Sequence, residues 1–397
     1  MTLSDASDSF YRHVAQTSEH ALGIEISHAE GCYFYDVHNK KYLDFISGIG
    51  VSAIGHGHPK VVKAIKEQVD RHLHVMVYGE FIQETQTTFA KKLTDLLPPT
   101  LDCVYFTNSG TEANEGALKL AKRHTGRHEI VSFKGSYHGN TQGSLSVSDH
   151  EARKSAFRPL LPEVRFIRFN DQKDLRHISE RTACVIIEPI QGDAGVRVPD
   201  QAFMKRLRKA CDDHGALLIL DEIQTGFGRT GTMFAFKKFD IIPDILTLGK
   251  ALGGGLPLGA FVASSSLMKK LTFNPPLGHI TTFGGNPVCC AAGSAALDVI
   301  LEEKLLAGVE KKGALIEGLL KHPAIKEVRR EGLMIAVELS TEQEVENVVK
   351  GCLDDGLLLF WFLSCKNSFR MAPPLTVSEE EIREATGIIL SRLEGHH

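Results

Sequence analysis

The 397-residue chain lacks the features that would assign it to several common classes of protein. No apolar run approaches the ~20 residues that a membrane-spanning helix needs, so no membrane partner is expected. The formal net charge is −4 at pH 7, and without a basic excess no nucleic-acid partner is expected. The first residues, Met1 to Asp5, carry no basic region followed by an apolar stretch. No secretory signal is therefore predicted, which favours a cytoplasmic location.

Closely spaced cysteine pairs are also lacking. The eight cysteines are Cys32, Cys103, Cys184, Cys211, Cys289, Cys290, Cys352 and Cys365. None belongs to a Cys-x-x-Cys pair, so neither a metal site nor a disulfide framework is predicted. Reduced thiols fit a cytoplasmic protein. The tail from Glu394 to His397 is interpreted as an expression-tag remnant.

The length of the chain predicts two domains, or one domain with long extensions. Hydrophobic residues make up 43% of the chain and charged residues 24%, which is typical of a globular protein, and the chain is long for a single core. Strand-like and helical segments alternate from about residue 100 to 265, which predicts an α/β domain with a mostly parallel central sheet. From about Pro287 the pattern changes to a smaller α+β domain. We expect an N-terminal segment (1–50) that joins the small domain, a large domain (51–288) and a small C-terminal domain (289–397).

Local patterns predict individual elements. Residues 31–45 alternate and turn at Asn39, which predicts an antiparallel hairpin. A helix is expected over 201–214, with Asp200 as its N-cap and Gly215 at its end. A long helical stretch is expected over 289–320, and a strand near 357–360.

Two short apolar runs lead into charged residues. One, from Ala216 to Leu220, ends at Asp221, and the other, from Leu246 to Leu248, leads through a glycine to Lys250. Such runs predict buried parallel strands, whose carboxyl ends form ligand sites. A carboxylate and an ammonium group would thus meet, as they do where proteins hold pyridoxal phosphate. Each residue alone is explained as simply by a helix cap or a surface charge.

Further polar residues follow other predicted strands. Ser109, Gly110 and Thr111 join a strand to a helix, which predicts a phosphate site, although an unliganded N-cap has the same pattern. Tyr137 lies between glycines and is suited either to stacking on a planar ring or to packing in a turn. Arg370, in a strand-like run, is suited to binding a carboxylate. A surface arginine would be the simpler explanation.

Together these segments resemble the class III (ω-amino acid type) pyridoxal-phosphate-dependent aminotransferases of fold type I. The resemblance runs from about Gly31 to about Ile389. Its most specific stretches are Asp221 to Gly231, Leu248 to Ala251, and Thr282 to Pro287. The acetylornithine, ornithine and 4-aminobutyrate aminotransferases are the most similar members.

The resemblance implies roles for matched residues. Lys250 would be the Schiff-base lysine and proton carrier, and Asp221 the partner of the pyridine nitrogen. The other implied cofactor-binding residues are Ser109, Gly110 and Thr111 at the phosphate, Tyr137 on the ring, Gln224 near the ring hydroxyl, and His138 and Glu188. Thr282 is expected to reach the phosphate of the neighbouring subunit in a homodimer. Arg370 is expected to bind the carboxylate of the amino acid and of the 2-oxo acid.

Three substrate-binding positions depart from the family pattern. Val51 stands where the ornithine enzymes have an aromatic residue. Asn140 replaces an arginine, which removes a second carboxylate clamp. Asp193 replaces the glutamate that masks the carboxylate-binding arginine, and this shorter side chain is expected not to reach Arg370. The transfer reaction is therefore implied more firmly than its substrate.

The predicted activity is transfer of an amino group from an amino acid or ω-amine donor to a 2-oxo acid, with 2-oxoglutarate favoured and pyruvate as the other acceptor. One alternative is another fold type I reaction, such as that of an aminomutase or a decarboxylase. Stoichiometric consumption of the 2-oxo acid would distinguish the two. A remoter alternative is a non-catalytic protein that binds pyridoxal phosphate, whose colour an amino donor would not change.

Overall fold

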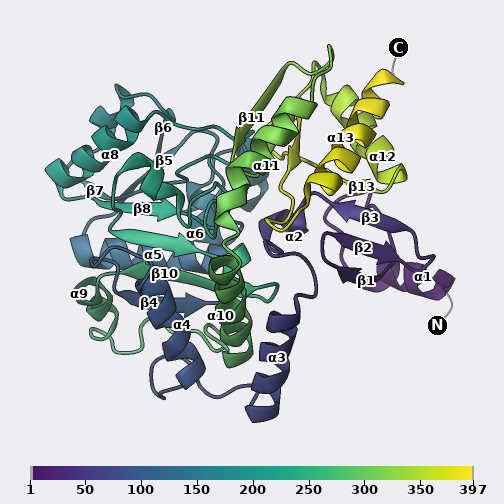
Figure 1. The fold of residues 1–397 in the computed structure, drawn as a ribbon. Coiled ribbons are helices and arrows are strands. Elements are labelled where there is room, and N and C mark those ends of the chain that lie inside the picture. Colours follow the sequence, from purple (N-terminus) through teal and green to yellow (C-terminus); the bar gives the residue numbers. More distant parts are fainter. Residues whose placement is uncertain (1–2, 396–397) are drawn as a thin grey trace.

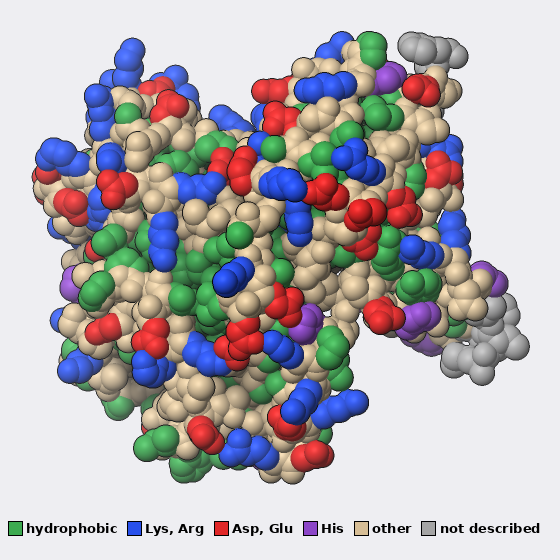
Figure 2. Space-filling model, in the orientation of Figure 1, with side chains coloured by type: hydrophobic (Ala, Val, Ile, Leu, Met, Phe, Trp, Pro, Cys, Tyr) green, Lys and Arg blue, Asp and Glu red, His purple; other side chains and the backbone are tan. Residues whose placement is uncertain are grey.

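The computed structural model describes residues 3–395 and has a large α/β part and a smaller part that contains both chain ends (Figure 1). Met1, Thr2, His396 and His397 lie outside the described residues. The predictions made for these positions, namely no secretory signal and an expression-tag remnant, stay predictions. Figure 2 shows acidic and basic side chains interspersed over one face of the molecule. None of the helices within residues 3–395 is both long and apolar enough to cross a lipid bilayer.

The large part is built on a seven-stranded sheet with the strand order β4-β10-β9-β8-β7-β5-β6. The strands are β4 (Cys103–Thr107), β5 (Glu129–Phe133), β6 (Val164–Ile167), β7 (Thr182–Ile187), β8 (Leu217–Asp221), β9 (Ile245–Leu248) and β10 (Gly259–Ala263). Strands β6, β5, β7, β8 and β9 pair in parallel, and only β10 runs against its two neighbours. The prediction of a mostly parallel central sheet is confirmed.

Two cores lie on opposite faces of this sheet. In β7, Cys184 and Ile186 belong to one core, and Val185 and Ile187 belong to the other. This alternation follows from the two-residue period of a strand, and burial on both faces explains the continuous apolar runs in the sequence. The helices of the large part are α3 (Pro59–Arg71), α4 (Glu84–Thr94), α5 (Gly110–Thr125), α6 (Gln142–Val147), α7 (Glu151–Lys154), α8 (Gln201–His214), α9 (Ser265–Met268) and α10 (Pro287–Glu302).

Two helix predictions can be compared directly with the structure. Helix α8 has the predicted bounds, and Gly215 ends it in the left-handed region at φ 61°. Asp200 occupies the N-cap position, but its side chain makes no capping bond and accepts from Asn170 Nδ2 at 3.2 Å instead. The long helical stretch predicted over 289–320 consists of two helices: α10 ends at Glu302, and α11 (Leu306–Leu319) begins after a turn at Lys304, whose φ is 51°.

The smaller part contains two four-stranded sheets. One has the order β1 (Ile26–Glu30), β2 (Tyr33–Asp36), β3 (Lys41–Asp44), β13 (Leu357–Leu358), and the other β11 (Glu327–Glu331), β12 (Met334–Glu338), β15 (Ser368–Met371), β14 (Phe360–Trp361). Its helices are α1 (Leu3–His13), α2 (Ser47–Gly50), α12 (Glu342–Asp354) and α13 (Glu379–Glu394).

The hairpin predicted over 31–45 is confirmed as β2 and β3, and Asn39 turns it with φ 61°. The strand predicted near 357–360 is in fact two short strands that belong to different sheets. Leu357 pairs in parallel with Leu43, so the N-terminal segment shares a sheet with the C-terminal part. The boundaries at 50/51 and 288/289 stay predictions. Helix α10 spans the second boundary and packs on α3 and α4.

Candidate active site at the carboxyl ends of the strands

A pocket of about 280 Å³ lies at the carboxyl edge of the central sheet. The strands β7, β8 and β9 run into it, and β4 points the same way because β10 is antiparallel to both β4 and β9. Most of the predicted site residues line this pocket: Gly110, Thr111, Tyr137, His138, Asn140, Glu188, Asp221, Gln224 and Lys250. Gly139, Ile190, Ile223 and Thr225 complete its wall.

Lys250 enters the pocket directly after β9. Its φ of 49° is in the left-handed region, so the chain turns sharply after Gly249. Burial, and then the positive charge of Arg370, lower the pKa of Lys250 to about 8. A neutral amine, the form that attacks a carbonyl carbon, is therefore available close to neutral pH.

Asp221 ends β8 and is fixed by three donors. Its Oδ2 lies 2.7 Å from His138 Nδ1 and accepts from Asn114 Nδ2 at 2.9 Å, and its Oδ1 accepts from the Ile223 N–H at 3.1 Å. His138 Nε2 is buried and has no partner within residues 3–395. Since an ionised carboxylate only accepts hydrogen bonds, His138 Nδ1 carries the hydrogen and donates the hydrogen bond to Asp221. The acid is thus held in one orientation.

The start of α5 lies beside Lys250. Ser109 caps this helix by accepting from the Glu112 N–H at 3.3 Å, and the positive end of the helix dipole faces the site. A Cβ on Gly110 would come within 2.6 Å of Ile223 Cδ1, and one on Gly249 within 3.2 Å of Gly110 Cα. Glycine at 249 lets the lysine loop contact the helix start, and glycine at 110 makes room for the Ile223 side chain.

These groups fit pyridoxal phosphate. One pocket offers an amine for the aldehyde of the cofactor, a fixed acid for its ring nitrogen and a helix N-terminus for its phosphate. Glu188 binds two backbone groups at the same edge, the N–H of Tyr137 at 2.9 Å and the N–H of Gly192 at 3.0 Å. Burial raises the pKa of Glu188 to about 7.

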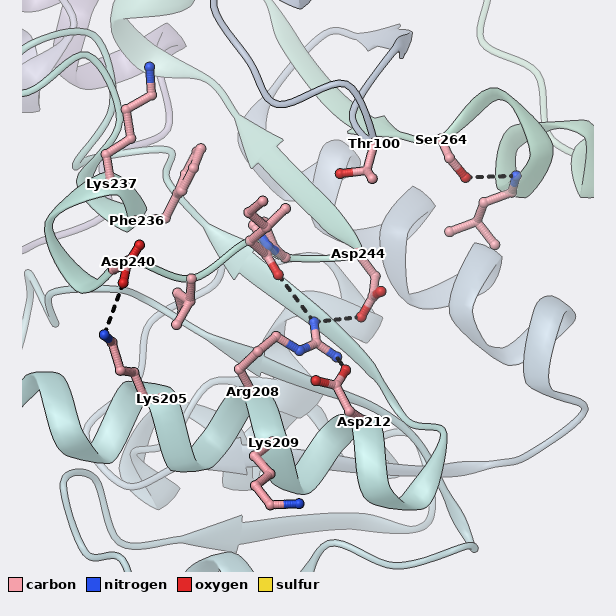
Figure 3. A pocket seen from close by; sticks show the side chains of 14 residues that line it. Thr100, Lys205, Arg208, Lys209, Asp212, Phe236, Lys237, Asp240, Asp244 and Ser264 are labelled. Carbon is pink, nitrogen blue, oxygen red and sulfur yellow. Dashed lines mark hydrogen bonds and ion pairs between the residues drawn. The ribbon is translucent and has the colours of Figure 1, made fainter.

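A larger hollow, of about 920 Å³, lies at the opposite edge of the sheet, where Asp244 precedes β9 (Figure 3). Most of its charged side chains form ion pairs, whereas Lys237 donates to the Leu96 carbonyl at 3.0 Å and has no carboxylate partner within residues 3–395. Arg208 bonds Asp244 at 2.8 Å and Asp212 at 2.7 Å, and Lys205 bonds Asp240 at 2.9 Å. Because most of its cations are neutralised in this way, the hollow offers less for an anionic ligand than the smaller pocket does.

Comparison with known proteins decides the family. Residues 14–393 match the family model described as Aminotransferase class-III. The chain belongs to this family. Membership confirms the predicted fold type, the aminotransferase activity and the dependence on pyridoxal phosphate.

Several relatives match over almost the whole length of the aminotransferase. It is 41% identical to an acetylornithine aminotransferase of Methanopyrus kandleri over 359 residues, which are 90% of each protein. It is 42% identical to one of Methanocaldococcus jannaschii over 378 residues, 91% of each. The solved ornithine aminotransferase of Toxoplasma gondii is 31% identical to this chain, with a TM-score of 0.91. The similarity covers 99% of this chain and 94% of that one, whose own active site is described with partial occupancy of pyridoxal phosphate.

Five predicted site residues of the aminotransferase lie outside the pocket lining, and Asp193 is described after the other four. Ser109 caps α5, and Val51 lines a neighbouring pocket of about 240 Å³. Arg370 is buried on β15, with its guanidinium 4.6 Å from the centre of the Phe362 ring. Thr282 is exposed in this single chain. The roles of all the site residues stay predictions.

Asp193, the remaining predicted site residue, reaches Arg370, contrary to expectation. Its Oδ1 accepts from Arg370 Nη2 at 2.8 Å, and both side chains are buried. The expectation considered only the length of the side chain. The distance is set by the backbone, because the Leu363 N–H at 3.0 Å and the Ser364 hydroxyl also donate to Asp193 and bring the two segments together.

Three residues that belong to the site were not predicted from the sequence. Asn114 lies one turn beyond Gly110 on α5, so helical spacing from the phosphate motif would have found it. Arg153 and Ser364 gave no such signal, because both meet Asp193 from distant segments of the chain.

Proposed function

We propose that this aminotransferase takes its amino group from an ω-amine donor of the acetylornithine, ornithine or 4-aminobutyrate type and passes it to a 2-oxo acid, with 2-oxoglutarate as the expected acceptor. The observation that carries this proposal is the buried ion pair between Asp193 and Arg370. While Asp193 neutralises Arg370, the pocket favours an amine without a neighbouring carboxylate. Once Asp193 gives up Arg370, the guanidinium is available to the carboxylate of the 2-oxo acid.

Each residue has a part in this scheme. When bound, pyridoxal phosphate supplies an aldehyde that takes up the amino group and a ring that accepts electrons. Asp221, oriented by His138 and Asn114, holds the ring nitrogen. Lys250, with a pKa lowered to about 8, exchanges a proton at the reacting carbon near neutral pH.

The remaining contacts position the cofactor and exclude water from it. Ser109, Gly110 and Thr111 bind the phosphate at the start of α5, and Tyr137 covers the ring. Glu188 fixes the backbone of Tyr137 through its N–H. Asn140, whose Nδ2 donates to the Tyr137 hydroxyl at 3.2 Å, orients the aromatic side chain instead of clamping a carboxylate.

A donor panel tests the proposal. Acetylornithine, ornithine, 4-aminobutyrate and simple α-amino acids are each mixed with 2-oxoglutarate or pyruvate, and glutamate or alanine is measured. We expect an ω-amine to be the best donor, with one 2-oxo acid consumed per amino group transferred. Lys250→Ala should abolish turnover, whereas Lys269→Ala, at an exposed lysine, should not. Activity confined to α-amino acids would contradict the proposal.

We also propose that the catalytic unit is a homodimer in which Thr282 reaches the neighbouring pocket. Thr282 lies between two exposed apolar side chains, Ile280 at 50% exposure and Phe283 at 58%. The Phe283 ring contacts His74 of the segment between α3 and α4, with the ring centres 5.0 Å apart. That segment also exposes Ile82 at 95%, and apolar side chains gather over it at the lower end of Figure 2. Exposed apolar side chains that gather in this way are typical of a protein interface.

Light scattering during gel filtration tests the dimer. The wild-type protein should run at twice the chain mass, and Phe283→Asp should shift it toward the monomer with loss of activity. Thr282→Ala should keep the dimer but weaken cofactor binding. A wild-type monomer with full activity would rule the dimer out. A cytoplasmic location is supported by the eight unpaired cysteines, and thiol titration of the denatured protein without reductant should count all eight.

A further inference from the structure

Asp193 lies between two arginines. Its Oδ1 accepts from Arg370 Nη2 at 2.8 Å, and its Oδ2 lies 3.4 Å from Arg153 Nη1. Within residues 3–395, neither arginine forms an ion pair with any other carboxylate. One acid is therefore shared by two guanidinium groups, which come from β15 and from α7.

The loop after β14 completes a cradle around this carboxylate. The Leu363 N–H donates to Oδ1 at 3.0 Å, and the Ser364 hydroxyl donates to Oδ2. Each oxygen of Asp193 thus has one arginine and one loop group as donors. If Arg370 turns away, three donors remain, and one of them carries a positive charge.

The remaining positive charge matters because Asp193 is buried, with 4% of its surface exposed. Taking the partner from a buried ion pair normally leaves an uncompensated charge, which is costly. Arg153 is suited to prevent this, since its side chain is 30% exposed and its present contact with Asp193 is long. Its charge also acts on the pocket wall: burial raises the pKa of Tyr137, and Arg153 opposes that rise.

We propose that Arg153 is a positioning residue that holds Asp193 whenever Arg370 binds the carboxylate of the 2-oxo acid. This inference rests on the proposed function and deepens it. Asp193 stays in its cradle and transfers its main ion pair from Arg370 to Arg153. Arg370 is then free to bind substrate without leaving a bare carboxylate in the protein. Arg153 thereby governs the second half of the reaction and not the first.

The experiment measures the two half-reactions separately by the absorbance of the holoenzyme. Arg153→Gln should raise the half-saturating concentration of both pyruvate and 2-oxoglutarate by about tenfold, and change that of the amine donor by less than about twofold. Arg153→Lys should restore much of the loss, because it keeps the charge. Arg158→Gln is the matched control, since Arg158 is nearby but pairs at the surface with Glu151 at 2.7 Å.

A double-mutant cycle isolates the route of the effect. In an Asp193→Asn background there is no carboxylate left to hold, so adding Arg153→Gln should change 2-oxo acid binding by less than about twofold. Calorimetry with glutarate, an unreactive dicarboxylate, gives a readout that needs no turnover. The dissociation constant of glutarate should rise about tenfold in Arg153→Gln. It should not rise in the Arg158→Gln control, or when Arg153→Gln is added to Asp193→Asn.

Several results would overturn the inference. Equal losses in both half-reactions would give Arg153 a general structural role. A loss that persists with Asp193→Asn, or that affects 2-oxoglutarate and not pyruvate, would mean that Arg153 contacts the substrate itself. Unchanged values in Arg153→Gln would refute this inference alone, because wild-type transfer would stand. A wild-type enzyme that passes no amino group to any 2-oxo acid would refute the proposed function, and this inference with it.

Discussion

Burial and the charge on Arg370 together keep Lys250 reactive, so an Arg370→Met substitution should make the lysine less reactive. Burial and the charge of Arg370 lower the pKa of Lys250 from 10.5 to about 8. At pH 7.5, about a quarter of such lysines are neutral, compared with about one in a thousand at the ordinary pKa, a difference of about 200-fold. Arg370→Met removes one of the two lowering influences, so the pKa should rise and the neutral fraction at pH 7.5 should fall.

The assay is the rate at which apoprotein takes up pyridoxal phosphate covalently, followed by absorbance between pH 6.5 and 10. The rate should follow the neutral amine, with a midpoint near pH 8 in the wild type. The midpoint should move up in Arg370→Met and down in Asp193→Asn, because the negative charge of Asp193 raises the pKa of Lys250. Lys250→Ala gives the baseline. A wild-type midpoint near 10.5, or shifts of the same sign in both variants, would refute the reasoning.

Three further predictions concern the walls of the site. Gly110→Ala should weaken cofactor binding, since its Cβ would come within 2.6 Å of Ile223 Cδ1, and adding Ile223→Ala should restore the dissociation constant; no recovery would contradict the clash. Asn114→Leu removes one donor to Asp221 and should lower kcat/KM by about 10- to 100-fold with substrate binding little changed. A change in KM with kcat unaltered would contradict a role of Asn114 in orienting Asp221. Burial raises the pKa of Glu222 from 4.5 to about 7, so the folded state holds a proton that the unfolded state has released, and the unfolding free energy of the apoprotein should fall as pH rises between these values. In urea titrations, the unfolding free energy of Glu222→Gln should depend less on pH than that of the wild type. An unchanged pH dependence would exclude Glu222 as the cause.

The centre of the site could be predicted from the sequence because of the physics of a parallel sheet. Strands buried on both faces are continuous apolar runs, and ligands collect where such strands end. Glu188 follows β7, Asp221 ends β8 and Lys250 comes two residues after β9, and all three line one pocket. The bounds of α8 were equally predictable, since an apolar face and a final glycine mark them locally.

The periphery of the site could not be predicted in the same way. The break at Lys304 between α10 and α11 has neither glycine nor proline to signal it. The contact between Asp193 and Arg370 depends on the positions of two backbone segments that are 177 residues apart. Arg153 joins the same carboxylate from a third segment. Tertiary packing decides such contacts, and one sequence carries no local record of them.

The pairing of Leu43 with Leu357 constrains how this chain is made. The Leu43 N–H donates to Gly356 at 2.8 Å and the Phe45 N–H donates to Leu358 at 3.1 Å. A ribosome therefore releases the N-terminal hairpin long before the strand that completes its sheet exists. Throughout that interval the nascent protein exposes an open backbone edge, the kind of edge at which separate chains join and aggregate. Chain termination before residue 356 would make that exposure permanent.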